Sequence, residues 1–551
     1  MITAHTAAAV REAEEPLLAA GVPLMDRAAF ALAAHVAAEL RARGHRVSGS
    51  VVLLLVGGGN NGGDALHAGA HLARRGCEVH AALLADRVHP GGLAAARTAG
   101  VRLHDVLGAL ADDGARDDGA RADDGARDGV VRLARGAGVW VDALTGIGAR
   151  GGLREPLAGV VAALAAEKAS SPDEPVVVAV DVPSGIGVDD GAVDGPVLPA
   201  DVTVTMGTAK PGLLLPPAAA LAGRVEIVDL GLDAALAAAA PSVCRLLGAD
   251  VADLWPVPGP ADHKYTRGVL GLVAGSQAYP GAAVLAASGA LGAGLGMIRY
   301  LGPGTPTALV HARHPEVVTA RGRVQAWAIG SGIDPADVGR AEEMEEHLAA
   351  ALADLLPVVL DAGALTLLHD DRFPDLPETA VLTPHAGELA ALLTARGEAT
   401  TRAAVDAAPA RHARLAAEIT GATVLLKGAT TLVVAPDGPV HAQADGTAWL
   451  ATAGAGDVLA GILGALLAGY GDVLAAADDG AQRASLPARL AAAAALVHGR
   501  AARLAAGLAV PGPGGGGPGP GEPMATGGPG APITALDVAG AVPAALRTLL
   551  G

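Results

Sequence analysis

The chain is poor in several residue types that whole classes of protein need. Its two cysteines, Cys77 and Cys244, lie far apart, so they form neither a disulfide framework nor a cysteine-based zinc cluster. Aromatic residues make up 2% of the chain, which argues against platforms that stack nucleic-acid bases. Lys and Arg number 39 against 57 Asp and Glu, and a net charge of −18 disfavours nucleic acid and anionic membranes as partners. Any phosphate must therefore bind through backbone amides, a few local cations or a metal ion.

Long apolar runs are also scarce. The stretches 282–297 and 458–469 are broken by glycines and fall short of the roughly 20 apolar residues that cross a membrane. Arg11, Glu12 and Glu14 interrupt the start of the chain, which therefore lacks the apolar core of a signal peptide. We expect a soluble, cytoplasmic protein. Its 551 residues exceed what one hydrophobic core organises, which predicts two domains.

The first half alternates short Val-, Leu- and Ala-rich runs with alanine-rich helical segments. Residues 6–20 and 23–43 carry apolar side chains at helical spacing. The short runs are typical of strands buried on both faces, and the alternation predicts a doubly wound parallel sheet. The expected strands are 51–56, 79–84, 138–142, 176–181, 202–206 and 225–230.

The second half has its own alternation of strands and helices. Its expected strands are 269–274, 308–311, 325–329, 357–361, 379–382, 423–427 and 431–435. Its expected helices are 282–297, 386–396, 402–419, 456–470, 485–506 and 534–550. The stretch 234–241 is the best boundary, which gives domains 1–238 and 243–551. Two low-complexity tracts, about 111–129 and 511–532, are expected to be a disordered and a flexible insertion.

A glycine-rich loop follows the first expected strand. Gly57, Gly59 and Gly62 match the spacing of a dinucleotide-binding turn, with Asp86 as a possible ribose partner, although a plain strand-to-helix turn has the same pattern. The loop continues as Asn60-Asn61-Gly62-Gly63-Asp64. Its carboxamides and carboxylate are oxygen ligands that suit a ribose or a hard cation.

Two further expected strands end in similar residues. Asp142 ends one strand and is followed by the glycine-rich stretch 146–152, and Asp181 ends another and is followed by Ser184. Each segment alone is more often a helix cap or a turn. Three such strand ends in one parallel sheet indicate a ligand site at its carboxyl edge.

These motifs, with Leu24–Ala28 upstream and Lys210-Pro211-Gly212 downstream, resemble the NAD(P)HX epimerase family over roughly residues 1–235. The resemblance implies a Rossmann-like domain in which Asp181 is the acid/base at carbon C6 of the hydrated nicotinamide. It also implies a potassium ion held by Asn61, Asp142 and Ser184. The implied substrate contacts are Asn60, Asn61, Gly62, Gly63, Asp64, Gly146, Ile147, Gly148, Ala149, Arg150, Gly151, Gly152 and Asp181. Ala65 departs from the family, which has glycine there.

A second glycine-rich loop, Ala453-Gly454-Ala455-Gly456-Asp457, precedes an apolar helix. Asp457 is either a simple N-cap or a base beside a glycine anion hole, able to take a proton from a hydroxyl that is being phosphorylated. Lys427 and the hydroxyls of Thr430 and Thr431 follow another expected strand and suit a nucleotide. A lone histidine such as His385 is more often structural than catalytic.

In this order, the motifs are similar to those of the ADP-dependent NAD(P)H-hydrate dehydratase family, over about residues 262–510. The resemblance implies a ribokinase-like α/β fold and ADP, with Mg²⁺, as co-substrate. ADP would contact Lys427, Gly428, Ala429, Thr430, Thr431 and Gly456. The hydrate would contact Ala282, Gly332, His385 and Asp457, and Asp457 would be catalytic. Three positions depart from the family pattern, namely Ser331, Gly363 and Ala455.

The sequence therefore predicts a two-site enzyme that repairs hydrated NADH and NADPH, by epimerisation in one domain and ADP-driven dehydration in the other. Its partners would be these small molecules, and we expect it to self-associate. An alternative is a ribokinase-like kinase of a vitamin-like alcohol, joined to a non-catalytic nucleotide-binding module. A plain NAD dehydrogenase is less consistent, because it leaves the paired asparagines and the second loop without a role.

Overall fold

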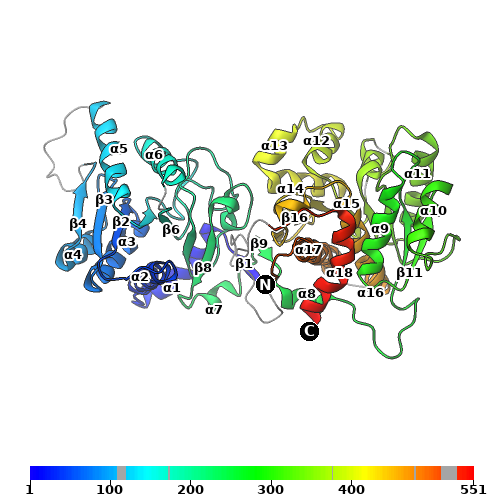
Figure 1. Cartoon of the computed structure of the whole chain (residues 1–551), viewed down its shortest axis with the longest axis horizontal. Coiled ribbons are helices and arrows are strands. Elements are labelled where there is room, and N and C mark those ends of the chain that lie inside the picture. Colours follow the sequence, from blue (N-terminus) through cyan, green and yellow to red (C-terminus); the bar gives the residue numbers. More distant parts are fainter. Residues whose placement is uncertain (108–119, 172–173, 371, 375, 477–479, 511–529) are drawn as a thin grey trace. The chain divides into compact units, whose positions relative to one another are not determined.

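A computed structural model describes residues 1–107, 120–171, 174–370, 372–374, 376–476, 480–510 and 530–551 (Figure 1). The chain divides into two compact units. The first is Thr3–Ser242, and the second consists of Met1, Ile2 and the described residues from Val243 onward. Both units are of the α/β class, as predicted from the alternation of strands and helices.

The first unit is built on a seven-stranded parallel sheet of order β4-β3-β2-β5-β6-β7-β8. Its strands are β2 Val51–Val56, β3 Glu78–Leu83, β4 Arg102–Asp105, β5 Val139–Ala143, β6 Val176–Val180, β7 Val202–Met206 and β8 Arg224–Val228. Its helices are α1 Ala7–Ala19, α2 Leu24–Ala42, α3 Asn60–Arg74, α4 Pro90–Ala99, α5 Ala120–Arg135, α6 Leu157–Ser170 and α7 Asp233–Leu236. The order reverses between β2 and β5, and sheets of this kind bind ligands beyond the strand ends at such a point.

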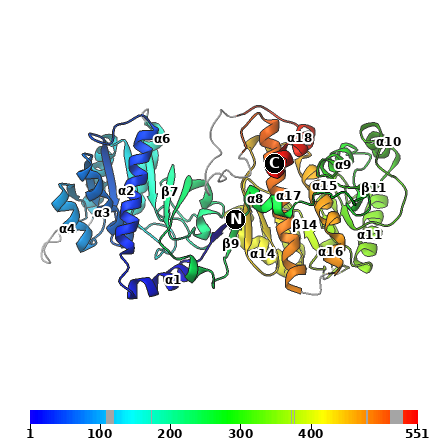
Figure 2. The ribbon, with the colours of Figure 1, turned by 90° about the horizontal axis from the view of Figure 1, so that it is seen from below.

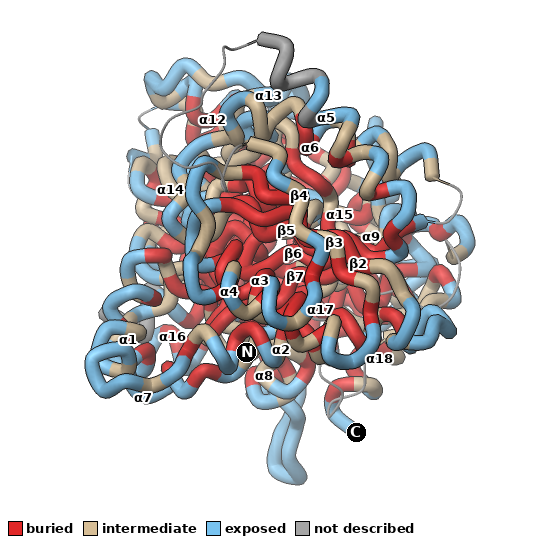
Figure 3. Tube along the Cα trace, turned by 90° about the vertical axis from the view of Figure 1, so that its left-hand side faces the viewer, coloured by how far each residue is buried: buried red, intermediate tan, exposed pale blue. Residues whose placement is uncertain are grey.

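Both faces of this sheet are buried because successive side chains of a strand point to opposite sides. Leu54 and Val56 of β2 pack with α2 and α3, whereas Leu53 and Leu55 pack with α5 and α6. Helices α2 and α3 lie side by side on their face (Figure 2). The central strands β2, β5 and β6 are correspondingly buried, which explains why they are almost continuously apolar in sequence (Figure 3).

The second unit has a ten-stranded mixed sheet of order β1-β9-β17-β16-β15-β14-β13-β12-β10-β11. The strands are β1 Ile2–Ala4, β9 Val243–Arg245, β10 Val269–Val273, β11 Met297–Leu301, β12 Ala326–Ile329, β13 Val358–Leu360, β14 Ala380–Leu382, β15 Thr423–Leu426, β16 Thr431–Val434 and β17 Val440–Gln443. The part from β11 to β15 is parallel, and β15, β16 and β17 form antiparallel pairs.

Eleven helices of the described residues accompany this sheet. They are α8 Gly248–Leu254, α9 Gly281–Gly292, α10 Gly304–Arg313, α11 Val338–Ala353, α12 Ala386–Ala395, α13 Arg402–Ala407, α14 Pro409–Thr420, α15 Ala455–Gly469, α16 Gly471–Ala476, α17 Gly480–Ala505 and α18 Ala535–Leu550. Helices α9, α15, α17 and α18 form the main helical core of the unit. Among the described helices, no single one is long and apolar enough to span a membrane, and only α1 and α2 taken together, bent by 114°, reach that length and composition.

Several sequence predictions of single elements were wrong. The expected strand 308–311 is part of helix α10, and the expected helix 282–297 ends at Gly292 and is followed by strand β11. The expected helix 402–419 is two helices, because Pro409 begins a new one. Strands β1, β4, β9, β11 and β17 were missed.

The two predicted insertions fall largely outside the described residues. Helix α5 begins at Ala120, so the expected disordered tract 111–129 was too long at its end, and residues 108–119 are not described. Residues 511–529 of the expected glycine- and proline-rich excursion are not described either. The expected closing helix is confirmed as α18.

The close approach of α15 to α9 predicts which glycines in this core tolerate a side chain. A Cβ atom at Gly461 would lie 2.0 Å from the backbone oxygen of Ala286, whereas one at the exposed Gly540 of α18 would meet nothing within 4 Å. We expect Gly461→Ala to lower the free energy of unfolding of this unit by about 1–3 kcal/mol. Gly540→Ala, the control, should raise it by about 0.5–1 kcal/mol. Denaturant unfolding of the two variants measures this, and equal stabilities would contradict the packing argument.

Candidate active sites

The glycines at the end of β2 allow loops of the first unit to approach one another closely. A Cβ atom at Gly57 would lie 1.9 Å from the Leu144 backbone oxygen, and one at Gly62 would lie 2.1 Å from the Gly57 oxygen. Helix α3 starts directly at Asn60, after Gly59, which provides no side-chain cap. The amides of its first turn are therefore available to an anion.

Asn61, Asp142 and Ser184, the predicted ion ligands, lie at the ends of neighbouring elements of this unit. The Ser184 hydroxyl donates to Asp142 Oδ1 at 2.6 Å, and the Ser184 amide donates to Oδ2 at 2.8 Å. The Asn61 amide group donates to the Thr145 carbonyl at 2.9 Å and to the Val180 carbonyl at 2.7 Å. Thr145 connects Asn61 to the other two residues, because its amide donates to the Ser184 hydroxyl at 3.0 Å.

The chemistry of this cluster fits a hard monovalent cation. Asp142 is fully buried, and burial raises the pKa of its carboxyl although the Ser184 hydrogen bonds oppose the rise. The Thr145 hydroxyl is buried and has no hydrogen-bond partner among the described residues. Within those residues no group of three His, Cys, Asp or Glu could hold a metal, so the available ligands are oxygens of mixed type. Such a donor set suits an alkali or alkaline-earth ion better than a transition metal.

Asp181 is the centre of a separate buried ion pair. It follows β6 with a φ of 67°, in the left-handed region that a non-glycine residue seldom adopts. Its Oδ1 accepts hydrogen bonds from Lys210 Nζ, from the Met206 amide at 3.1 Å and from the Thr205 hydroxyl at 3.2 Å. Lys210 is itself 1% exposed. Sequence reasoning gave Lys210 no role beyond its motif, although a lysine in the middle of an apolar stretch is a signal of a buried partner.

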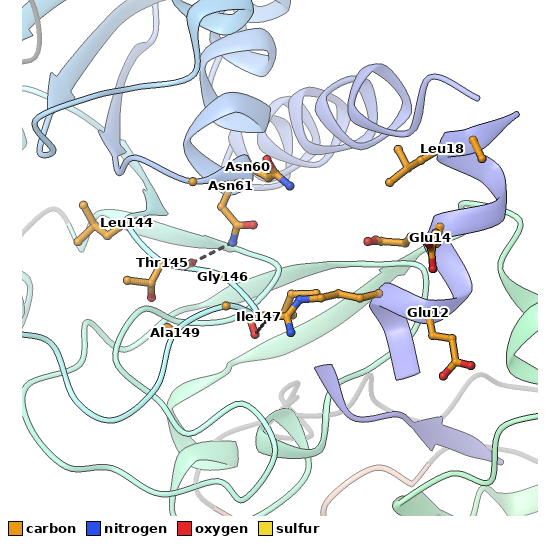
Figure 4. Close-up of a pocket in the computed structure, with 15 residues that line it drawn as sticks. Glu12, Glu14, Leu18, Asn60, Asn61, Leu144, Thr145, Gly146, Ile147 and Ala149 are labelled. Carbon is orange, nitrogen blue, oxygen red and sulfur yellow. Dashed lines mark hydrogen bonds between the residues drawn. The ribbon is translucent and has the colours of Figure 1, made fainter. Parts of the chain in front are cut away.

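A cavity of about 1090 Å³ lies beside Asn61 and Thr145 (Figure 4). Its walls are the start of α3, the loop after β5 and helix α1, and the Arg11 guanidinium ties that helix to the loop through a 2.7 Å bond to the Ile147 carbonyl. The predicted residues that line it are Asn60, Asn61, Gly146, Ile147, Gly148 and Ala149. Arg150, Gly151 and Gly152 line a neighbouring cavity of about 420 Å³ on the other side of the same loop.

The remaining predicted residues of this half lie deeper. Gly62 and Gly63 are buried in the first turn of α3, and Ala65 is also buried there, so its methyl group is accommodated. Asp64 is 7% exposed, and burial raises the pKa of its carboxyl well above the ordinary value, helped by Asp181 and Glu14. The contribution of helix α1 to the cavity was not predicted.

In the second unit, Asp457 lies in the first turn of α15. The N-cap of this helix is Gly454, with a φ of 86° and no side-chain cap, so Asp457 does not serve as an N-cap. Burial raises the pKa of Asp457 to about 7, with Asp361 adding to the rise and Lys427 opposing it. His498 of α17 hydrogen-bonds the backbone of Ala455, and its burial lowers the pKa of that imidazole to about 4. The glycine-rich loop 453–457 therefore contacts a histidine that is neutral near pH 7.

Lys427 links Asp457 to a second carboxylate that the sequence did not single out. Its ammonium lies 2.9 Å from Asp361 Oδ1 and 3.8 Å from Glu388 Oε2. Burial alone would lower the pKa of Lys427, but Asp361, Glu388 and Asp457 together raise it. A Cβ atom at Gly456 would lie 3.3 Å from the ammonium, so Lys427 reaches the glycine loop. Asp361 also accepts hydrogen bonds from Ser331 and Thr383, each at 2.8 Å.

The other predicted residues of this half occupy neighbouring positions. The His385 side chain caps α12 by accepting the Gly387 amide at 3.0 Å, and the His385 backbone forms a β-bridge with Lys427. A Cβ atom at Gly332 would lie 2.2 Å from that of Ala282, so these two residues are in contact. Gly428, Ala429, Thr430 and Thr431 continue from Lys427 into β16.

The departures from the family pattern in this half have physical explanations. A Cβ atom at Gly363 would lie 2.1 Å from the Ile333 backbone oxygen, so an acidic side chain is not accommodated in the present backbone. Ser331 donates to Asp361, and Ala455 is buried beneath the loop.

The raised pKa of Asp457 predicts a cost to stability. An acid whose pKa is about 7 in the folded chain and 3.8 ordinarily destabilises folding as the pH rises from about 4 to about 7, because the unfolded chain loses the proton first. We expect Asp457→Asn to be more stable than the parent by a few kcal/mol at about pH 8, because a tenfold change in an acid's dissociation constant corresponds to about 1.4 kcal/mol. The difference should vanish near pH 4. Unfolding of the second unit followed against pH tests this, and a difference that does not vary with pH would contradict it.

Comparison with known proteins finds relatives of both units. Residues 21–212 match the family model described as YjeF-related protein N-terminus, and residues 270–511 match the one described as NAD(P)H-hydrate dehydratase. A NAD(P)H-hydrate epimerase of Clavibacter michiganensis is 46% identical over 246 residues, covering 43% of this chain and 94% of its own. The ADP/ATP-dependent NAD(P)H-hydrate dehydratase of Bacillus subtilis, crystallised with ATP and Mg²⁺, aligns with a TM-score of 0.42 and 24% identity, over 55% of this chain and 98% of its own.

Relatives that match across both units include the bifunctional NAD(P)H-hydrate repair enzyme Nnr of Mycobacterium tuberculosis. It is 43% identical over 471 residues, which cover 83% of this chain and 88% of the relative. The matched length includes most of both units, so the likeness is not confined to one domain. The chain belongs to the family of bifunctional NAD(P)H-hydrate repair enzymes.

Proposed function

We propose that the chain restores hydrated NADH and NADPH, with an epimerase in the first unit and a dehydratase in the second. The observation that carries the proposal is the presence of two separate carboxylate–lysine centres, the buried pair Asp181 and Lys210 and the half-buried Asp457 with Lys427 near it. Each lies beside a glycine-rich loop at a helix N-terminus, where phosphates of a nucleotide are bound well. One centre would interconvert the R and S hydrates, and the other would consume the S form.

In the first unit, Asp181 would exchange a proton at the C6 hydroxyl of the hydrate. The lone pair of the ring nitrogen expels the hydroxyl as water once it is protonated, and water that adds to the other face of C6 gives the opposite epimer. The substrate would lie in the 1090 Å³ cavity, with its phosphates toward the first turn of α3. Asn60, Asn61 and Gly146 to Ala149 line this cavity, and Gly62, Gly63, Asp64 and Arg150 to Gly152 would complete the contacts with the substrate.

A potassium ion would be held by Asn61, Asp142 and Ser184. When bound, it would supply a positive charge against the buried Asp142 carboxylate, which has no basic partner in the contacts of the described residues. Ser184 also accepts the Thr145 amide at 3.0 Å, so the same residues position the loop that forms a wall of the cavity.

In the second unit, Asp457 would take the proton of the C6 hydroxyl while that oxygen attacks the terminal phosphate of ADP, which leaves AMP. A pKa of about 7 suits a group that accepts a proton near neutral pH. Lys427 and its neighbours to Thr431, with Gly456 and Mg²⁺, would hold the phosphates. Expulsion of the new phosphate by the ring nitrogen, with loss of a proton from C5, then yields NAD(P)H. Ala282, Gly332 and His385 would contact the hydrate. The chain would also associate with further copies of itself.

Recovery of absorbance at 340 nm from an equilibrated mixture of R and S hydrates tests both activities together. With ADP, Mg²⁺ and potassium, the parent chain should convert the whole mixture. Asp181→Asn should stop once the S fraction is spent, because only spontaneous exchange remains, and Asp457→Asn should lower recovery by roughly 10²-fold or more. A phosphorylated product that accumulates would instead support the ribokinase-like kinase.

Thermal unfolding tests the potassium site without an assay of activity. Potassium should raise the Tm of the first unit in the parent chain, because it binds the folded state only. Asp142→Asn should abolish this rise, since it removes the ligand charge, while a variant distant from the site, Gly540→Ala, should keep it. An equal response of the parent to potassium and to a bulky organic cation would contradict the assignment.

A further inference from the structure

Epimerisation at C6 requires proton handling on two faces of one ring. A hydroxyl leaves from one face and water adds from the other, so one group must donate a proton while another accepts one. Asp181 alone does not serve both faces, because its Oδ1 already accepts hydrogen bonds from three donors, one of them the Lys210 ammonium.

Glu14 of α1 is the residue best placed for the second role. Its carboxyl lines the cavity and points toward the side formed by Asn61 and Thr145 (Figure 4). It is half-buried, and among the described residues it has no hydrogen-bond or ion-pair partner. Glu12 and Glu15, on the same helix, also line the cavity but are exposed, and Glu12 points away from Asn61 (Figure 4). Asp64 interacts electrostatically with Glu14 but does not line the cavity.

The charges around Glu14 link it to the Asp181 centre. Burial raises the pKa of Glu14, Lys210 and Arg11 lower it, and Asp181 raises it, with the net direction upward. The pKa of Asp64 responds to both Glu14 and Asp181. Glu14 is therefore electrostatically linked to the Asp181–Lys210 pair, although it comes from a different part of the chain.

Resting on the epimerase function proposed above, we propose that Glu14 is a second catalytic residue of the first unit, which exchanges protons at C6 in alternation with Asp181. In one direction the Glu14 carboxylic acid protonates the C6 hydroxyl, the C–O bond breaks with the electron pair of the ring nitrogen completing a C=N bond, and water leaves. Water then adds to the opposite face and gives its proton to the Asp181 carboxylate. One proton is given by Glu14 and one is accepted by Asp181, and exchange with solvent water returns both groups to their starting states. The reverse reaction exchanges the two roles.

Exchange of R and S hydrates in the full chain without ADP isolates this step, because dehydration cannot proceed. Glu14→Gln should lower kcat for exchange by roughly 10²-fold or more and change KM by less than about threefold. Glu14→Ala should be equally slow and recover with added formate, a small acid that fits the vacated space. Glu78→Gln, in β3 and outside the lining of the cavity, is the control and should behave like the parent.

Three results distinguish a failure of the Glu14 proposal from a failure of the epimerase function. Dehydration of the S hydrate with ADP should be unchanged in every Glu14 variant, which reports on the integrity of the chain. A kcat for Glu14→Gln within about threefold of the parent, or a loss in Glu14→Ala that formate does not restore, would overturn the role of Glu14. Absence of exchange in the parent chain itself would overturn the epimerase function instead.

Discussion

The register of the parallel sheet is the constraint on which the first site depends. Val56 pairs with Ala143, Asp142 with Ala179 and Val180 with Val204, so the chain leaves each strand at nearly the same level. A shift of one residue in any of these pairs would turn Asp142 or the residues around it to the other face of the sheet. The carboxylate, hydroxyl and amide groups gather only because these strand ends are aligned and glycines 57 and 62 leave no side chains between them.

A second feature common to both sites is a carboxylate with a lysine close to it. Lys210 contacts Asp181 directly, whereas Lys427 bonds Asp361 and acts on Asp457 from further away. The difference in distance has a chemical consequence. At Asp457 burial outweighs the effect of the more distant ammonium and raises the pKa of the carboxyl to about 7. The second arrangement suits a base that must release its proton in each cycle.

Much of this architecture was predictable from sequence because the strands are buried on both faces and strongly apolar. Val51–Val56 and Val176–Val180 have no polar residue, and glycines or acids mark where they end. The failures have equally local causes. Leu309 and Val310 have β-like composition but lie in α10, where tertiary packing overrides propensity. Strand β11 contains Arg299 and follows an alanine-rich helix without a strong break. The helical spacing of apolar residues therefore continues past Gly292, and the predicted helix was too long.

The parts of the sites that sequence reasoning missed are those that depend on contacts distant in the chain. Asp361 and Lys427 are 66 positions apart, and Lys210 and Asp181 are 29 apart, so no motif contains both members of either pair. The same applies to α1, whose acidic residues read in sequence as a solvated helix surface. The 2.7 Å bond from Arg11 to the Ile147 carbonyl brings this helix over the loop after β5, and Glu12, Glu14 and Glu15 of the helix line the cavity. A helix that precedes the sheet in sequence therefore closes the site that the sheet builds.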